Sequence, residues 1–139
     1  MSGSVVTETS PAPPFRHRIA ARCAIGVALL LARLSPRRMR RAMEFLSRGA
    51  RPADHAGALR ARDAVVAVSV RCAGPWCLQR SIATALLCRA RGRWPDWYTG
   101  VRTQPFRAHA WVAAEGRPVG EHDASLRLFL PIMSVRARR

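Results

Sequence analysis

Apolar side chains recur at helical spacing through the first two-thirds of the chain, which predicts a largely helical portion. Ser35 before Pro36 is a typical helix start, and Gly49 and Gly92 follow expected helix ends. β-branched residues crowd the end of the third apolar segment, so its C-terminal boundary is the least defined. The expected helices are Phe15–Leu34, Pro36–Arg48, Pro52–Arg71 and Trp76–Arg89.

Beyond Pro95 the pattern changes to short segments of aromatic and β-branched residues, which is typical of strands. The last apolar stretch, Leu126–Val135, contains Pro131, which restricts it to an edge strand or to a loop packed on the core. The fold class is therefore expected to be α+β, with a helical N-terminal portion packed on a small antiparallel sheet. The expected strands are Trp97–Thr103, Phe106–Ala113 and Arg117–Glu121.

The loop between the second and third expected strands decides which side chains face each other. Residues 114–116 suit a three-residue loop whose last residue, a glycine, is left-handed, and that register pairs His109 with Glu121. A two-residue loop at 115–116 would instead place His122 opposite His109 and turn Glu121 to the other face. The glycine at the third loop position favours the first register.

Length and composition bound the organisation of the chain and its compartment. A chain of 139 residues fits one domain, and residues 1–14, rich in Ser, Thr and Pro, are expected to form a disordered tail before a single domain at 15–139. The longest apolar run, Cys23–Ala32, is too short to span a bilayer. Four cysteines without a secretory signal favour reduced thiols, so we expect a cytoplasmic protein with no transmembrane segment.

The charge is strongly unbalanced, with 24 basic residues, all arginine, against 8 acidic ones and a net charge of +16. Such a surface either is simply solvated or attracts an acidic partner, and both interpretations stay open. Trp94, Trp97 and Tyr98 lie near Arg91 and Arg93 in an arrangement that stacks on RNA bases in some proteins. No recognised nucleic-acid module surrounds them, so no nucleic-acid partner is expected.

Cys77 is the strongest candidate for chemistry, because it falls at the expected start of the fourth helix. Unpaired N–H groups and the positive end of the helix dipole favour a thiolate there and can hold an oxyanion. His109 on the second strand is the candidate base, and Glu121 faces it in the favoured register. Asp123, one pair further on the same face, is the reserve acid. The alternative is that Cys77 and His109 only pack in the core.

Further side chains near these positions are candidates for a substrate cleft, although aromatic residues more often serve packing. The spacing of Cys72, Cys77 and Cys88 is not that of a usual zinc site, so we expect no metal. Nor does thiol chemistry of this kind need an organic cofactor. The cleft candidates are Trp76, Arg80, Ser81 and Trp111.

Five segments carry a resemblance to a known family, and its specific part covers Val70–Asp123. The segments are Cys77–Ser81, Leu86–Leu87, Gly100–Val101, Pro105–Val112 and Gly116–Val119. Together they resemble the lasso peptide maturation peptidases, in their stand-alone form, which are similar to transglutaminase-like and papain-like cysteine proteases. The helical N-terminal part matches that family in length and style only.

The resemblance implies a transglutaminase-like catalytic core and removal of the leader peptide from a lasso peptide precursor. Cys77 would be the nucleophile and His109 the general base, while Glu121 stands where the family generally has Asp. The implied partners are the precursor peptide as substrate, a separate leader-binding protein and a lasso cyclase. Two other functions stay open: a thiol acyltransferase that uses an amine in place of water, and a non-enzymatic basic module that binds nucleic acid or a membrane surface.

Overall fold

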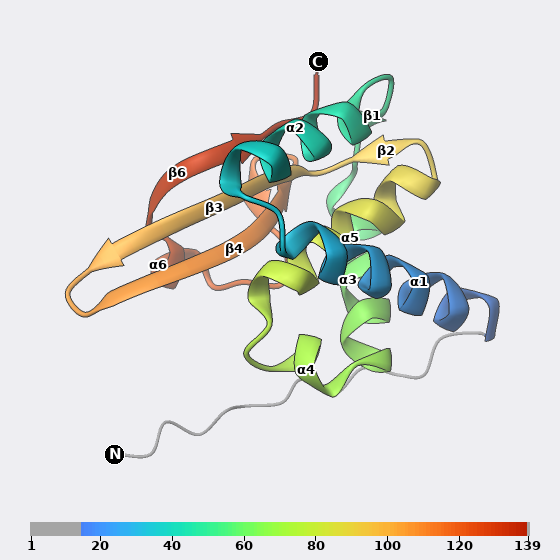
Figure 1. Ribbon diagram of the computed structural model, residues 1–139, viewed down its shortest axis with the longest axis horizontal. Helices are drawn as coiled ribbons and strands as arrows, with labels where there is room; N and C mark the ends of the chain where they lie inside the picture. The colour runs from blue at the N-terminus through green and yellow to red at the C-terminus, as the bar shows by residue number, and fades with distance from the viewer. Residues whose placement is uncertain (1–14, 139) are drawn as a thin grey trace.

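The computed structural model describes residues 15–138, and the expected tail at 1–14 lies outside these residues. Helices and a small antiparallel sheet form the mixed fold that the pattern predicted (Figure 1). The helices are α1 (Phe15–Ala32), α2 (Pro36–Ser47), α3 (His55–Val68), α4 (Val70–Ala73), α5 (Cys77–Ala90) and α6 (Asp123–Leu126). The strands are β1 (Arg51–Pro52), β2 (Arg93–Trp94), β3 (Asp96–Thr103), β4 (Phe106–Ala114), β5 (Arg117–Pro118) and β6 (Leu130–Val135).

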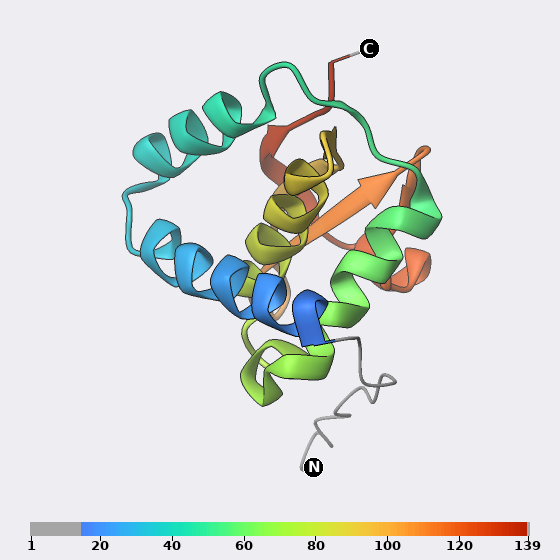
Figure 2. The same cartoon turned by 90° about the vertical axis from the view of Figure 1, so that its right-hand side faces the viewer.

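Helix α5 lies at the centre of the helical portion, with α1 and α3 packed along it and β4 against another side (Figure 2). Its inner residues are small or apolar, and Ile82, Ala83 and Ala85 are fully buried. Alanines on the facing side of α1 let the two helix backbones approach closely. The first residue of α5 is therefore held at a fixed place beside the sheet.

The third expected helix is divided in two, which the sequence pattern did not predict. Ser69 adopts extended backbone angles (φ −139°, ψ 113°) and separates α3 from α4. Its hydroxyl accepts a hydrogen bond from Cys72 N (3.2 Å), so it serves as the cap of the short α4. The start of that helix was also wrong, because Arg51–Pro52 pairs in parallel with Arg93–Trp94 instead of beginning a helix.

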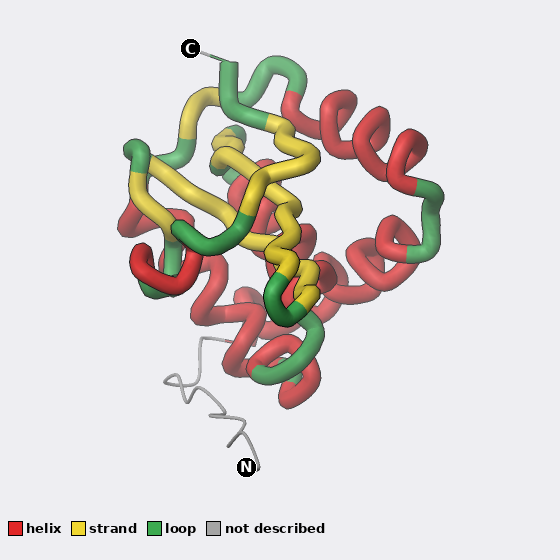
Figure 3. The backbone as a smooth tube through the Cα atoms, turned by 90° about the vertical axis from the view of Figure 1, so that its left-hand side faces the viewer, coloured by secondary structure: helices red, strands yellow, loops and turns green. Residues whose placement is uncertain are grey.

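The main sheet has the order β5-β4-β3-β6, with antiparallel neighbours. Figure 3 shows the strands in yellow beside the red helices. Strand β6 lies at the edge, in agreement with the position expected for a strand that contains Pro131. Strand β4 lies between two neighbours, and its His109 pairs with Gly100 of β3. The side chain at 109 is thus carried by a strand that is held on both sides.

The hairpin from β4 to β5 has the register that we did not favour. Ala114 pairs with Arg117, which leaves a two-residue loop of Glu115 and Gly116. Both loop residues have positive φ (55° and 74°), as a type I′ turn requires, and that turn matches the right-handed twist of the strands. The predicted strand pairing of His109 with Glu121 is therefore wrong.

Strand β5 is also shorter than expected, because the chain leaves the sheet after Pro118. Gly120 has φ +69°, a left-handed conformation that turns the backbone away from the strand direction. The following residues form the short helix α6 before the chain returns as β6. In residues 15–138, no helix combines the length and the apolar character needed to cross a membrane.

Candidate active site

Cys77 is the first residue of α5, as the pattern predicted, so its thiol lies at the start of that helix. Trp76 occupies the N-cap position but makes no side-chain hydrogen bond to the helix. The first N–H groups of α5 therefore lack a side-chain acceptor, and their partial positive charge faces the region of the thiol. The side chain is half-buried, so a reagent or substrate can still reach it.

His109 of β4 meets Cys77 because α5 packs directly on β4. Burial raises the pKa of the Cys77 thiol, but hydrogen bonds from His109 and from Ala110 N–H outweigh burial and leave the pKa below its ordinary value. Burial lowers the pKa of His109, whereas its hydrogen bonds with Cys77 and Glu121 raise it, and the result is a pKa of about 9. At neutral pH the pair is therefore biased toward thiolate and imidazolium.

Glu121 completes the arrangement, with its Oε1 atom 3.3 Å from His109 Nε2. With Nε2 turned to the carboxylate, Nδ1 is the ring nitrogen left to serve the thiol. Burial raises the pKa of Glu121, but the hydrogen bond with His109 and the nearby positive charges lower it below its ordinary value. The carboxylate is therefore ionised at neutral pH and holds the imidazole by a charge-assisted hydrogen bond.

Glu121 reaches His109 from outside the sheet rather than from across a strand pair. The left-handed turn at Gly120 brings the chain back over β4, and this turn packs against Arg62 so closely that a Cβ atom at 120 would lie 2.6 Å from its guanidinium. The reserve acid, Asp123, is exposed at the first residue of α6. The structure thus brings Glu121, and not Asp123, to the imidazole.

Two buried arginines also surround the Glu121 carboxylate. Arg80 Nη2 lies 3.5 Å from Oε1 and Arg62 Nη2 lies 3.9 Å from it, and both side chains are at most 10% exposed. Arg62 was not among the site residues predicted from the sequence. The available signal was its position between Ala58 and Val65 at helical spacing, which places a charge on the buried face of α3. A charge at such a position needs a buried partner.

Three of the four cleft candidates lie in the interior instead. Ser81 is 3% exposed, and its hydroxyl donates to Leu78 O (2.8 Å) and accepts from Trp97 Nε1 (3.0 Å). Arg80 and Trp111 are likewise buried, because α5 packs on β4. Trp76 remains half-buried beside Cys77, with the Arg71 guanidinium 5.0 Å from its ring centre.

Aromatic rings hold the imidazole in place along β4. The His109 ring stacks on Trp111 at 5.9 Å and lies 5.5 Å from Phe129. Gly100 makes room for this stack, because a Cβ atom there would lie 3.0 Å from the Trp111 ring and 2.9 Å from the Leu130 carbonyl oxygen. The orientation of the candidate base is thus fixed by packing as well as by Glu121.

The other buried cysteines differ from Cys77 in their acidity. Burial raises the pKa of Cys72 above its ordinary value and raises that of Cys88 to about 12, so both are thiols at neutral pH. Within residues 15–138, no three His, Cys, Asp or Glu side chains gather in a way that could hold a metal ion. The contacts of Cys77 with His109, and of His109 with Glu121, are those of an activated thiol with an adjacent base.

Comparison with known families matches residues 21–134 to the model of the transglutaminase-like superfamily, which covers most of the chain. Neither the curated proteins nor the solved structures contain a match. Domains of this superfamily commonly form the cores of cysteine peptidases and acyltransferases. The matched residues include the helix that carries Cys77 and the strand that carries His109, and the chain belongs to the transglutaminase-like superfamily.

Proposed function

We propose that this protein is a cysteine peptidase that removes the leader from a lasso peptide precursor. The observation that carries the proposal is the contact series from Cys77 through His109 to Glu121, with a lowered thiol pKa at a helix start. The segments that resemble lasso peptide maturation peptidases narrow the substrate to a leader–core junction. Superfamily membership supports the thiol chemistry but does not by itself choose the substrate.

In the acylation step the Cys77 thiolate attacks the carbonyl carbon at the junction and forms a tetrahedral oxyanion. Free N–H groups at the start of α5 lie where they can stabilise that negative charge. When the C–N bond breaks, the His109 imidazolium gives its proton to the departing amine. The products of this step are the free amine of the core peptide and a thioester between the leader and Cys77.

In the deacylation step neutral His109 takes a proton from water, and the hydroxide attacks the thioester carbonyl. Collapse of the second tetrahedral intermediate releases the leader carboxylate and restores the thiolate–imidazolium pair. Glu121 remains ionised throughout, because its pKa is held low, and it orients the imidazole and stabilises its positive charge. Side chains and backbone N–H groups of this chain supply every protein group used in the two steps.

The proposed partners follow from the same resemblance. A separate leader-binding protein would present the precursor, and a lasso cyclase would use the released core. The leader-binding protein is therefore included in the test below.

The test is incubation of the protein with a lasso precursor peptide and its leader-binding protein, followed by mass spectrometry. We expect free leader and free core from the wild type and none from Cys77→Ala. Cys23→Ala, which removes an exposed thiol on α1, is the matched control and should cleave like the wild type. Circular dichroism of each variant confirms that loss of activity is not loss of folding.

Two outcomes would contradict the proposal in different ways. An added amine joined to the leader, in place of a free leader carboxylate, would identify an acyltransferase that uses the same thioester. Cleavage that persists in Cys77→Ala would remove the thiol from the chemistry altogether, and Cys77 and His109 would then be packing residues.

A further inference from the structure

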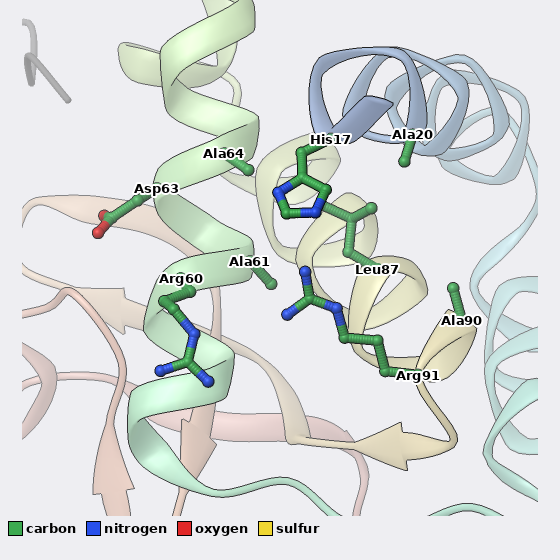
Figure 4. A pocket seen from close by; sticks show the side chains of 9 residues that line it. All are labelled: His17, Ala20, Arg60, Ala61, Asp63, Ala64, Leu87, Ala90 and Arg91. Atoms are coloured by element: carbon green, nitrogen blue, oxygen red, sulfur yellow. The ribbon is translucent and has the colours of Figure 1, made fainter. Parts of the chain in front are cut away.

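A groove separate from Cys77 lies between α1, α3 and α5, with a volume of about 540 Å³. Figure 4 shows its lining side chains, which come from all three helices. The C-terminal end of α5 and its C-cap contribute Leu87, Ala90 and Arg91 to the lining, whereas Cys77 is the first residue of that helix. It therefore belongs to a different part of the surface from the candidate active site.

The groove is open because small residues line it. Ala20 of α1, Ala61 and Ala64 of α3, and Ala90 of α5 face it, and Leu87 is its one large apolar side chain. Three helices packed with larger residues at these positions would fill the space between them. The floor is thus apolar and shaped to accept an apolar side chain from elsewhere.

The rim of the groove is cationic. Arg60 and Arg91 are exposed at its edge, and the Arg91 guanidinium lies near the His17 ring in Figure 4. Among residues 15–138, neither arginine side chain makes an ion pair or donates a hydrogen bond. Asp63 is the one acidic lining residue, and in Figure 4 its carboxylate points away from the other side chains.

A second hollow of about 180 Å³ continues the groove past Arg60 and Arg91 and adds Arg93 to its lining. Its own acidic residue, Asp54, caps α3 and accepts a hydrogen bond from Gly57 N (3.2 Å). The two hollows together form a track with an apolar floor and three guanidinium groups along it. The three guanidinium groups favour an acidic ligand, and the apolar floor favours a ligand that also carries an apolar side chain.

We infer that this groove binds an acidic segment of the substrate peptide that also carries an apolar side chain, an inference that rests on the proposed function. Helix α5 is 14 residues long and thus spans about 20 Å. An extended peptide covers that distance with about six residues. The acidic segment therefore lies several residues away from the bond that Cys77 attacks.

Binding is tested in the Cys77→Ala protein, so that no cleavage intervenes. The probe is a short fluorescent peptide rich in glutamate and leucine, and its anisotropy is measured against a matched peptide with glutamine in place of glutamate. The double variant Arg60→Gln/Arg91→Gln should bind the acidic probe about tenfold more weakly. The control Arg37→Gln/Arg41→Gln removes the same charge from exposed positions of α2 and should lose about twofold or less.

A third variant, Ala20→Trp, fills the groove at unchanged charge and should weaken binding as much as the loss of the two arginines. Equal losses in the two arginine double variants would mean attraction by the whole basic surface and would overturn the inference. Unchanged binding by Ala20→Trp would overturn it as well, because the apolar floor would then play no part.

The same variants separate this inference from the proposed function. In the active protein, Arg60→Gln/Arg91→Gln should raise KM for the precursor and leave kcat unchanged, because the lost contacts are remote from the thiol. If the precursor is not cleaved at all while the probe still binds in the groove, the proposed function fails and the inference that the groove binds an acidic peptide holds. If that double variant cleaves the precursor with an unchanged KM, the proposed function holds and the inference about the groove fails.

Discussion

Arg80 connects the helix that carries the thiol to the segment that carries the acid. Its Nη2 atom lies 3.5 Å from Glu121 Oε1, and its Nη1 atom donates to Cys72 O at 3.0 Å. One guanidinium thus holds the end of α4, the first turn of α5 and the loop after β5. Because Arg80 follows Cys77 by less than one helical turn, any movement of Glu121 is resisted by the same helix that positions the nucleophile.

Arg80→Met should lower the free energy of unfolding by about 3 kcal/mol, because it removes one of the cations beside a half-buried carboxylate and the guanidinium that donates to a buried carbonyl. Urea denaturation measures this change. Arg40→Met is the matched control, because its ion pair with Glu44 is at least 50% exposed on both sides and should cost less than about 0.5 kcal/mol. Similar losses in the two variants would contradict the role given to Arg80.

The reactivity of Cys77 should show its lowered pKa. In a Cys23→Ala background, the alkylation rate with iodoacetamide should reach its plateau at a lower pH than for an ordinary thiol, because the lowered pKa of Cys77 means that its thiolate forms at a lower pH. In His109→Ala the pKa should return upward and the rate at pH 7 should fall about tenfold. Identical pH profiles for the two proteins would mean that His109 does not lower the pKa of the Cys77 thiol.

Precursor cleavage should also fall at the alkaline side, as the pH passes the His109 pKa of about 9. Above that pH the imidazole lacks the proton that the departing amine needs. The rate of cleavage between pH 6 and 10 measures this limb. A rate that stays constant through pH 10 would mean that another group protonates the amine.

Glu121→Gln should destabilise the protein in a way that depends on pH. The folded-state pKa of Glu121 lies below its ordinary value, so the carboxylate stabilises the fold fully above that value and loses this effect as the pH falls through the folded-state pKa. The variant should therefore be about 2 kcal/mol less stable at pH 7 and nearly equal to the wild type in strong acid. Thermal unfolding at several pH values gives the comparison, and a constant difference at every pH would contradict it.

Gly120→Ala should harm both stability and activity. Its φ of +69° disfavours a side chain, and the added Cβ would meet Arg62 at 2.6 Å. Gly49→Ala is the matched control, because Gly49 has nearly the same φ of +73° with no atom within 4 Å. We expect a loss of about 1 kcal/mol for the control and about 1 kcal/mol more at Gly120, together with slower cleavage only at Gly120.

The position of Cys77 and the element type around His109 were predictable, because a helix start and an alternating strand are local patterns. The contact between His109 and Glu121 was expected for the wrong reason. Glu115 accepts a positive φ, so the hairpin closes with two loop residues, and the carboxylate then arrives by way of the turn at Gly120. A single residue of positive φ outside the loop decided a contact that strand register alone would have excluded.

The role of Arg62 and the helix break at Ser69 could not be predicted from the sequence, for a related reason. Arginine is common throughout this chain, so the helical spacing that places residue 62 on the buried face of α3 was a weak signal until its partner at 121 was placed beside it. The serine at 69 fits a helix interior, and only tertiary packing turns its hydroxyl into the cap of α4. Both features depend on residues distant in the chain or on backbone angles that periodicity does not report.

Gly100 has a consequence for how far this sequence can vary. It pairs with His109 across the sheet, and the space of its missing side chain is taken by the Trp111 ring that stacks on the imidazole. Replacement of either Gly100 or Trp111 alone would leave an overlap or a void beside the base, so substitutions at these positions are expected to be tolerated only as a pair. Gly100, which has no side chain to take part in the reaction, is thereby placed under the same selective constraint as the base itself.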